Sequence, residues 1–216
     1  MAGMARLGQR GIVPSVPLAW PGETVVVIAT GPSLTQDDVD ACRGRARIIC
    51  VNDAYKMAPW ADALYATDAR WWRWHDGVPS FTGPKWSMEH SAWTLHRALY
   101  PDIQRLRNTG PNGLEHDPSG LRNGRNSGYA AVNLAVHYGA ARIVLLGFDM
   151  QAVKGRSHFF GEHPNRQRSP YNQFRRCFEF LVKPLKKRGV QVINCSRHSL
   201  LECFPKADLR QTLGVL

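Results

Sequence analysis

Short runs of apolar, mostly β-branched residues alternate along this chain with longer amphipathic or polar segments. Continuous apolar runs of four to eight residues are typical of strands covered on both faces. The runs predicted to be strands cover 25–29, 45–51, 61–66, 142–148 and 190–194. The segments predicted to be helical begin after Thr35 and cover 69–76, 91–100, 129–138, 171–188 and a tail over 199–213. This alternation predicts an α/β fold that is Rossmann-like and doubly wound, with a mostly parallel sheet and right-handed crossovers.

The stretch 25–34, VVVIATGPSL, carries the clearest local signal. A buried strand is followed there by the small residues Thr30, Gly31 and Ser33, and Thr35 then resembles the N-cap of a helix. Ligands of open α/β sheets bind outside the carboxyl ends of the strands, and a loop at a helix N-terminus suits phosphate. We therefore expect a nucleotide at this loop, and a plain turn is the alternative.

Two further predicted strands also end in small polar residues. Asn52 and Asp53 follow the run at 45–51, and Thr67 and Asp68 follow the run at 61–66. Polar side chains at the carboxyl edge of a sheet are what a ligand-binding crevice requires.

A second helix N-terminus is predicted at Ser127 and Gly128, preceded by Arg122 and Arg125. The strand at 142–148 ends at Asp149, which should reach the same edge of the sheet. We expect Arg125, Ser127, Gly128 and Asp149 to line the nucleotide site.

The segment 69–76, ARWWRWHD, allows two interpretations. Its tryptophans can form a helix face in the core, which is the commoner use of such a cluster. They can also form a stacking platform for a base or a sugar, with Arg70 and Arg73 beside it.

The remaining segments predict the domain organisation. Residues 1–22 resemble a Pro- and Gly-containing arm, and residues 23–216 a single transferase-sized domain. The polar, His-containing segment 151–170 is predicted to be a lid. The passage 108–128 is rich in Gly, Pro and Asn and looks too polar for the core, which indicates a functional or mobile loop.

Composition adds a strong charge. Lys and Arg number 28 against 17 Asp and Glu, a net charge of +11, which favours an anionic partner such as nucleic acid, an acidic glycan or the phosphates of a nucleotide. The five cysteines include no C-x-x-C pair, so neither a disulfide framework nor a zinc site is indicated. No apolar run is long enough for a membrane span, and a cytoplasmic protein is expected.

An ordered series of motifs along the chain resembles bacterial glycosyltransferase family 42, the sialyltransferases, and the uncharacterised and pterin-pyrophosphokinase-like proteins that share its Rossmann-type core. The motifs are ATGPSL (29–34), VNDAY (51–55), LYATD (64–68), NSGYAAVNLAVHYGAARIVLLGFDM (126–150), HFFGEH (158–163) and INCSRHSLLECF (193–204). A small chain with these motifs would also suit a phage or prophage.

The resemblance implies roles for individual residues. It implies that Thr30, Gly31 and Ser33 approach the phosphate or ribose of a nucleotide, and that Asn52 contacts a cytidine nucleotide. It implies that Ser127 and Gly128 line the donor pocket.

The resemblance also implies that His163 is the general base that deprotonates an acceptor hydroxyl, with His158 as the competing candidate. An imidazole with a pKa near 6.5 can do this at neutral pH. The family uses a nucleotide-activated sugar as donor and needs neither a cofactor nor a metal ion. This chain departs from the family at Thr30, where asparagine is usual, and in the segment 151–168, which lacks the family's lid tyrosines.

Three functions follow from these observations. The first is a glycosyltransferase that uses a nucleotide sugar, acting on an anionic acceptor that could be DNA or RNA. The second is a nucleic-acid-binding protein on a degenerate transferase fold, which the charge and the Trp/Arg segment favour. The third is a pterin pyrophosphokinase that would hold Mg²⁺ with Asp53, Asp68 and Asp149, although these acids could equally be caps.

Overall fold

The computed structural model describes residues 14–90, 98–161 and 169–215. The strands are β1 (Thr24–Ile28), β2 (Arg47–Val51), β3 (Ala63–Tyr65), β4 (Lys85–Met88), β5 (Ile103–Asn108), β6 (Gly120–Leu121), β7 (Arg142–Leu146) and β8 (Gln191–Asn194). The helices are α1 (Gln36–Cys42), α2 (Ala69–Trp74), α3 (Ser127–Tyr138), α4 (Tyr171–Lys187) and α5 (Leu209–Leu213), with a 3₁₀ helix η1 (Asn52–Lys56).

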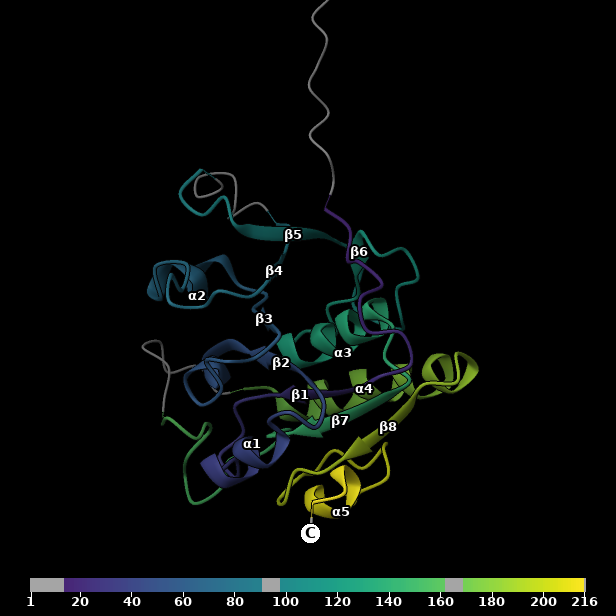
Figure 1. Ribbon diagram of the computed structural model, residues 1–216. Coiled ribbons are helices and arrows are strands. Elements are labelled where there is room, and N and C mark those ends of the chain that lie inside the picture. Colours follow the sequence, from purple (N-terminus) through teal and green to yellow (C-terminus); the bar gives the residue numbers. More distant parts are fainter. Residues whose placement is uncertain (1–13, 91–97, 162–168, 216) are drawn as a thin grey trace, which may run out of the picture.

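All the strands of this part of the chain form one sheet in the order β6-β5-β4-β3-β2-β1-β7-β8 (Figure 1). Every ladder between them is parallel. The prediction of a Rossmann-like α/β fold is therefore confirmed, and the sheet is more regular than the mostly parallel one expected.

Alternation along the strands divides the core into two layers. Val25 and Val27 of β1 face α3 and α4, whereas Val26 and Ile28 face the layer of α1, α2 and α5 (Figure 1). Successive side chains of a strand point to opposite faces, so a sheet covered on both sides needs apolar residues at every position. This requirement explains the continuous apolar runs in the sequence.

The strand order reverses between β1 and β7. After β1 the chain adds strands outward to β6 and then returns to place β7 on the other side of β1. Such a switch point opens a crevice at the carboxyl ends of the two strands. Thr30 and Gly31 follow β1 there, and Gly147 to Asp149 follow β7.

Predicted helix starts are confirmed at α1 and α3. The Thr35 side chain accepts a hydrogen bond from the backbone N–H of Asp38, and Asp38 in turn accepts from the backbone N–H of Thr35. The Asn126 side chain accepts from the N–H of Tyr129 at the start of α3. The helix predicted over 91–100 falls largely on residues outside the described ranges.

The passage between residues 80 and 122 contains structure that its sequence does not predict. It supplies β4, β5 and β6, which extend the sheet on one side. These strands are short or carry charged residues, so no apolar run marks them. In β5, for example, Ile103 and Leu106 are buried and the polar residues around them are more exposed.

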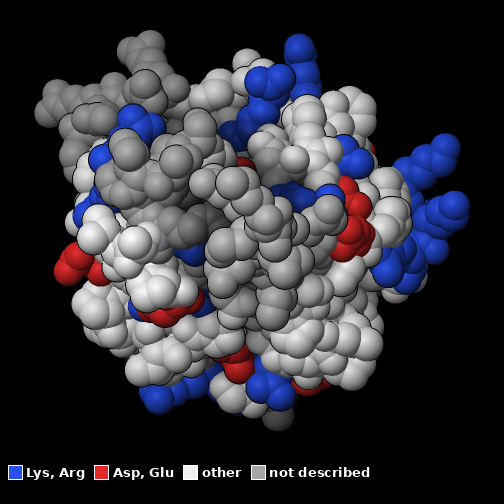
Figure 2. Space-filling view, turned by 90° about the horizontal axis from the view of Figure 1, so that it is seen from above, with Lys and Arg blue, Asp and Glu red and all other residues white. Residues whose placement is uncertain are grey.

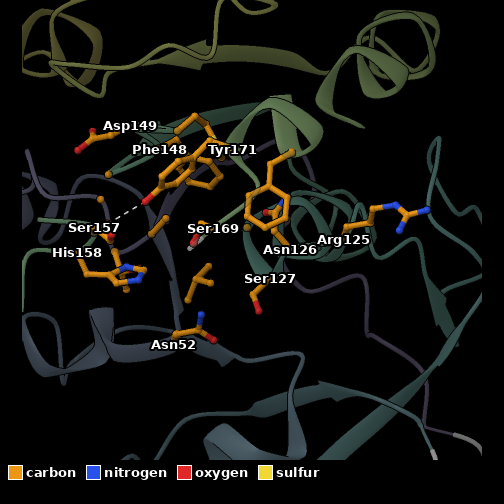
Figure 3. A pocket seen from close by; sticks show the side chains of 18 of the residues that line it. Asn52, Arg125, Asn126, Ser127, Phe148, Asp149, Ser157, His158, Ser169 and Tyr171 are labelled. Atoms are coloured by element: carbon orange, nitrogen blue, oxygen red, sulfur yellow. Dashed lines mark hydrogen bonds between the residues drawn. The ribbon is translucent and has the colours of Figure 1, made fainter. Parts of the chain in front are cut away.

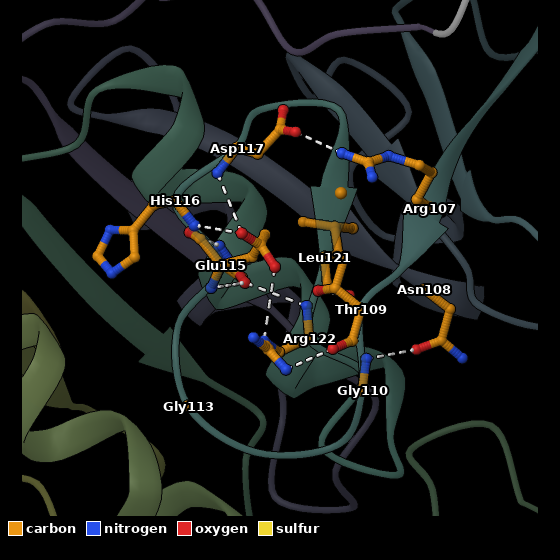
Figure 4. Close-up of polar contacts among 12 residues, drawn as sticks. Arg107, Asn108, Thr109, Gly110, Gly113, Glu115, His116, Asp117, Leu121 and Arg122 are labelled. Atoms are coloured by element: carbon orange, nitrogen blue, oxygen red, sulfur yellow. Dashed lines mark hydrogen bonds and ion pairs between the residues drawn. The ribbon is translucent and has the colours of Figure 1, made fainter.

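The Gly- and Asn-rich passage 108–128 is held by a network of hydrogen bonds, contrary to the prediction that it lies wholly outside the core (Figure 4). Leu114 and Leu121 are buried. The side-chain oxygen of Asn133, which is fully buried on α3, accepts hydrogen bonds from the backbone N–H groups of Glu115 and Arg122. Hydrogen bonds, the largest from Thr109, lower the pKa of Glu115 to about 2 and keep its carboxylate charged.

The predicted helical tail over 199–213 is mostly wrong, because only Leu209–Leu213 is helical. Residues 199–207 instead return along the sheet, where the N–H of Asn194 donates to the carbonyl of Pro205. Pro205 is itself incompatible with a helix interior. Within the described residues, no helix has the length and apolar character needed to cross a membrane.

Part of the predicted N-terminal arm packs against the domain. Val16 and Trp20 are buried, and the ring of Trp20 stacks on Tyr138 with centroids 3.7 Å apart. Tyr138 also accepts a hydrogen bond of 2.7 Å from the indole of Trp86. Residues 14–22 thereby cover the end of α3.

We predict that Gly31→Ala destabilises the fold strongly. A Cβ at Gly31 would lie 2.4 Å from the carbonyl oxygen of Gly147 and 2.7 Å from the carboxylate carbon of Asp149, so β1 and β7 would have to separate at their ends. Overpacking of this kind costs about 3 kcal/mol. Denaturant unfolding followed by circular dichroism measures the loss.

Gly44→Ala is the matched control, because Gly44 has a φ of +71° but no heavy atom near its Cβ position. It should cost about 1 kcal/mol through backbone strain alone. Equal losses for the two variants would contradict the close approach of the strand ends.

Candidate functional site

A cavity of about 470 Å³ lies at the carboxyl edge of the sheet, over the switch point between β1 and β7 (Figure 3). Its size is within the range of small-molecule sites. Of the residues that the sequence assigns to the site, those that line the cavity are Thr30, Gly31, Asn52, Asp68, Arg125, Ser127, Gly128, Asp149 and His158. Ser33, Asp53 and Thr67 lie behind it and hold its walls, and His163 lies outside the described residues.

The loop after β1 is tied to the end of β7. The Asp149 carboxylate accepts a hydrogen bond of 2.7 Å from the backbone N–H of Ser33 and one of 2.5 Å from its hydroxyl. The N–H of Gly31 donates to the carbonyl of Gly147 at 2.8 Å. Asp149 and Ser33 therefore fix the shape of the loop, and Thr30 and Gly31 are residues of this loop that reach the cavity.

The end of β7 is in turn held by the segment after β8. The N–H of Phe148 donates to the Ser196 hydroxyl at 2.8 Å, and the Ser199 hydroxyl donates to the carbonyl of Phe148 at 2.6 Å. The buried Asn194 amide donates to that same Ser199 hydroxyl. The NCSRHS sequence thus positions the floor of the cavity and contributes no lining residue itself.

The described part of the predicted lid lies against the β1 loop. The Thr30 hydroxyl and Nδ1 of His158 share a hydrogen bond of 3.0 Å, and the N–H of Phe159 donates to the Thr30 carbonyl at 3.1 Å. The His158 ring stacks on Phe160 with centroids 5.0 Å apart. These contacts orient His158 along the cavity wall, beside Asn52 and Ser157 (Figure 3).

The N-terminus of α3 forms the opposite wall. The Ser127 hydroxyl accepts a hydrogen bond of 3.3 Å from the N–H of Thr67, which joins this wall to the end of β3. A Cβ at Gly128 would lie 2.7 Å from the Phe148 ring, so glycine is required there. Because Ser127 and Gly128 at its start line the cavity, this 12-residue helix offers a site for an anion there. Arg125 extends away from the centre toward the rim (Figure 3).

Asn52 enters the cavity from the end of β2, with a φ of +51° that asparagine tolerates better than most residues. Its neighbour Asp53 points the other way and is buried. The Asp53 carboxylate accepts hydrogen bonds from Lys56 at 2.6 Å and from the Trp71 indole at 2.8 Å, and lies 3.3 Å from His75. Burial alone would raise the pKa of Asp53, but the bonds from Lys56 and Trp71 and the charge of His75 hold it below its usual value.

The tryptophan segment lies partly in the core and partly at the cavity, so the core interpretation holds for Trp72 and the stacking platform stays a prediction. Trp72 is fully buried and donates to the carbonyl of Ala66. Trp71 and Trp74 line the cavity together with Arg70, and Trp74 is 41% exposed.

Sequence reasoning missed several lining residues, among them Phe148, Ser157, Ser169, Tyr171 and Phe174. Tyr171 stands at the first position of α4, immediately after the lid, and its hydroxyl lies 3.5 Å from the carbonyl of Ser157 (Figure 3). Tyr171 lies just beyond the segment 151–168, in which the family's lid tyrosines were expected and which contains none. Its position at the junction of the predicted lid and the predicted helix is the sequence signal that could have identified it.

The acidic residues at the strand ends do not converge. Asp53 is committed to Lys56 and Trp71, and Asp149 to Ser33. In the described ranges there is no group of three or more His, Cys, Asp or Glu placed to hold a metal ion.

The basic side chains also lie apart. Figure 2 shows Lys and Arg spread around one face with acidic side chains between them. Arg107 forms an ion pair with Asp117, and Arg122 donates to the Thr109 carbonyl and lies 3.6 Å from Glu115, so Arg122 is part of the loop network and not of the cavity. Arg175, Arg176, Lys186 and Lys187 belong to α4.

Comparisons with known proteins identify one fold of known activity. Neither a scan against protein-family models nor a search of curated proteins finds a match. The fold is similar to that of the sialyltransferase CstII from Campylobacter jejuni, solved in complex with the substrate analogue cytidine-5'-monophosphate. The TM-score is 0.56 at 15% sequence identity, over 86% of this chain and 85% of that one. The expected relation to sialyltransferases is thereby supported at the level of the fold.

We predict that Asp53→Asn lowers stability by about 2 kcal/mol at pH 7, because a charged acceptor of several hydrogen bonds is lost. The folded pKa of Asp53 lies below its unfolded value near 3.9, so this stabilisation is present above that value and is lost as the pH falls through the folded pKa. Denaturant titrations at each pH should show that the difference in the free energy of unfolding between wild type and variant disappears as the pH falls below about 4.

Asp37→Asn is the control, because Asp37 is an exposed acid in the first turn of α1. It should change stability by about 0.5 kcal/mol or less at all pH values. A loss of equal size at Asp37 would show that the effect reflects net charge and not the Asp53 contacts.

Proposed function

We propose that this protein is a glycosyltransferase that transfers a sugar from a cytidine-nucleotide donor to an acceptor hydroxyl. The main support is the cavity at the switch point, which is lined by the β1 loop, by the N-terminus of α3 and by His158, whose ring is oriented by its hydrogen bond to Thr30. The similar fold of a sialyltransferase with bound cytidine-5'-monophosphate supports the choice of nucleotide.

In this proposal the donor phosphate lies between Gly31 and the N-terminus of α3. Backbone N–H groups at the start of α3 can stabilise the charge that develops on the leaving phosphate, which is the role that a metal ion has in other transferases. Tyr171 at the cavity centre is placed to donate its hydroxyl to the same phosphate (Figure 3). It would replace the tyrosines that the segment 151–168 lacks.

The transfer step needs one proton acceptor. The acceptor oxygen forms a bond to the anomeric carbon of the sugar while the bond from that carbon to the phosphate oxygen breaks. The electron pair of the broken bond leaves with the nucleotide monophosphate, and the hydroxyl proton passes to an imidazole nitrogen. We assign this role to His163, with His158 as the alternative, because Nδ1 of His158 already shares a hydrogen bond with Thr30. A nucleic-acid acceptor stays a prediction from the charge of +11.

We predict that cytidine-5'-monophosphate raises the melting temperature of the protein without added Mg²⁺, since a ligand that binds only the native state stabilises it.

Asn52→Gly should weaken the binding of cytidine-5'-monophosphate about tenfold and leave the fold intact, because glycine accepts the φ of +51° and removes only the side chain. Isothermal titration of both proteins measures the change. Unchanged affinity in a folded Asn52→Gly variant would remove Asn52 from the nucleotide site.

We predict that His163→Ala lowers the rate of sugar transfer by 10²-fold or more and retains nucleotide binding, as removal of a general base does. His158→Ala should mainly weaken nucleotide binding, because it removes the hydrogen bond that joins the predicted lid to the Thr30 hydroxyl. Transfer rates from cytidine-5'-monophosphate sugars across pH 5 to 9, with product detected by mass spectrometry, separate the two.

In these measurements the acid limb of the wild-type rate profile should disappear in His163→Ala. Its disappearance in His158→Ala instead would reassign the base. Full transfer by both variants would exclude histidine as the base.

A further inference from the structure

The part of the cavity beyond the carboxyl end of β3, on the far side from the β1 loop, is built by α2, and the proposed function leaves it without a role. The cavity crosses the carboxyl ends of β7, β1, β2 and β3, and α2 follows β3. Neighbouring strands lie about 4.8 Å apart, so the start of α2 is roughly 10 Å from the β1 loop. A phosphate at that loop leaves room for a ring beside α2.

Arg70, Trp71 and Trp74 share one face of α2, since positions three and four apart on a helix are neighbours. All of them line the cavity, and the Arg70 guanidinium lies 5.6 Å from the centre of the Trp74 ring. We call this face, together with Asp68, the α2 wall.

Trp71 is held rigidly within the α2 wall. Its indole N–H donates to the buried Asp53, and its ring packs edge-on against Trp72 with centroids 5.0 Å apart. Only 3% of Trp71 is exposed, whereas Trp74 at the rim is 41% exposed. The wall thus combines a buried inner ring with a partly exposed outer ring.

Asp68 adds an acceptor of hydrogen bonds. It occupies the N-cap position of α2, where an aspartate usually bonds to the helix amides, but its side chain makes no such bond. It lines the cavity instead. A carboxylate at the edge of an aromatic face suits neighbouring hydroxyl groups and repels phosphates.

We propose that the α2 wall is a sugar-binding subsite next to the nucleotide, which rests on the proposed function. The apolar C–H face of a pyranose stacks on Trp74, Asp68 accepts hydrogen bonds from ring hydroxyls, and Arg70 donates to a carboxylate on the ring. Asp68 argues against a nucleobase in a polynucleotide, because the accompanying phosphates would approach its charge. The ring can come from the donor or from the acceptor, since both present the same chemistry.

The first test uses methyl β-D-glucuronide and methyl β-D-glucoside as probes, with saturation-transfer NMR on the full chain in the presence of saturating cytidine-5'-monophosphate. Wild type should bind both, the glucuronide about tenfold more tightly. Trp74→Ala should lower the affinity for both probes about tenfold. Arg70→Gln should remove the preference for the glucuronide.

Trp60→Ala is the matched control, because Trp60 also lies under an arginine, Arg43, at 5.3 Å, but does not line the cavity. It should bind both probes as wild type does. Equal binding by Trp74→Ala and wild type, or no binding of either sugar to the nucleotide-bound wild type, would overturn the proposal. Displacement of cytidine-5'-monophosphate by the sugars would also overturn it, because the two would then share one subsite.

The second test separates the two sources of the ring. In Trp74→Ala, a raised KM for hydrolysis of a cytidine-5'-monophosphate sugar in water would assign the α2 wall to the donor sugar. Unchanged hydrolysis with a raised KM for the acceptor would assign it to the acceptor. Unchanged KM values for both would overturn the proposal, whereas absence of nucleotide binding in wild type would refute the proposed function itself.

Discussion

The close approach of the ends of β1 and β7 is the constraint on which the rest of this structure depends. Gly31 and Gly147 meet there with no space for a side chain, and the Gly31 amide donates to the Gly147 carbonyl. Because the sheet reverses its order at this point, the two loops diverge above it and leave a crevice. The place of the cavity, the orientation of His158 through Thr30 and the shape of the Ser33 loop all follow from this contact.

Buried polar side chains behind the cavity hold its walls, and each of them serves a different loop. Asp53 fixes Trp71 within the α2 wall, Asn133 fixes the passage before α3, and Asn194 fixes the floor through Ser199. A buried carboxylate or amide is costly unless it is fully hydrogen-bonded, so each of these residues specifies one arrangement of its loop. The polar lining residues are thereby held in place by hydrogen bonds and not by apolar packing alone.

Sequence reasoning found the elements whose signal is local. Continuous apolar runs predicted β1, β2, β3, β7 and β8, and Thr35 as a cap and the Ser127-Gly128 pair marked helix starts. It missed β4 to β6, because these strands have no continuous apolar run. Pairing with neighbouring strands and the loop network around Asn133 hold them in place. The strand-end rule brought Thr30, Asn52 and Asp68 to one cavity, and the predicted helix start brought Ser127 there. No sequence pattern shows that Asp53 turns inward or that Tyr171 lines the cavity.

The parallel pairing of β1 with β7 also bears on how the chain is made. More than half of the chain's length separates the two strands, and the entire side of the sheet from β2 to β6 is synthesised between them. Until β7 emerges from the ribosome, β1 is an edge strand whose residues Val25 to Ile28 are apolar on both faces. Exposed edges of this kind invite pairing with other chains. Delayed folding or a chaperone would protect this edge during synthesis. The cavity takes its lining from residues between Ala29 and Phe174, so it is assembled only after β7 and the start of α4 have been made.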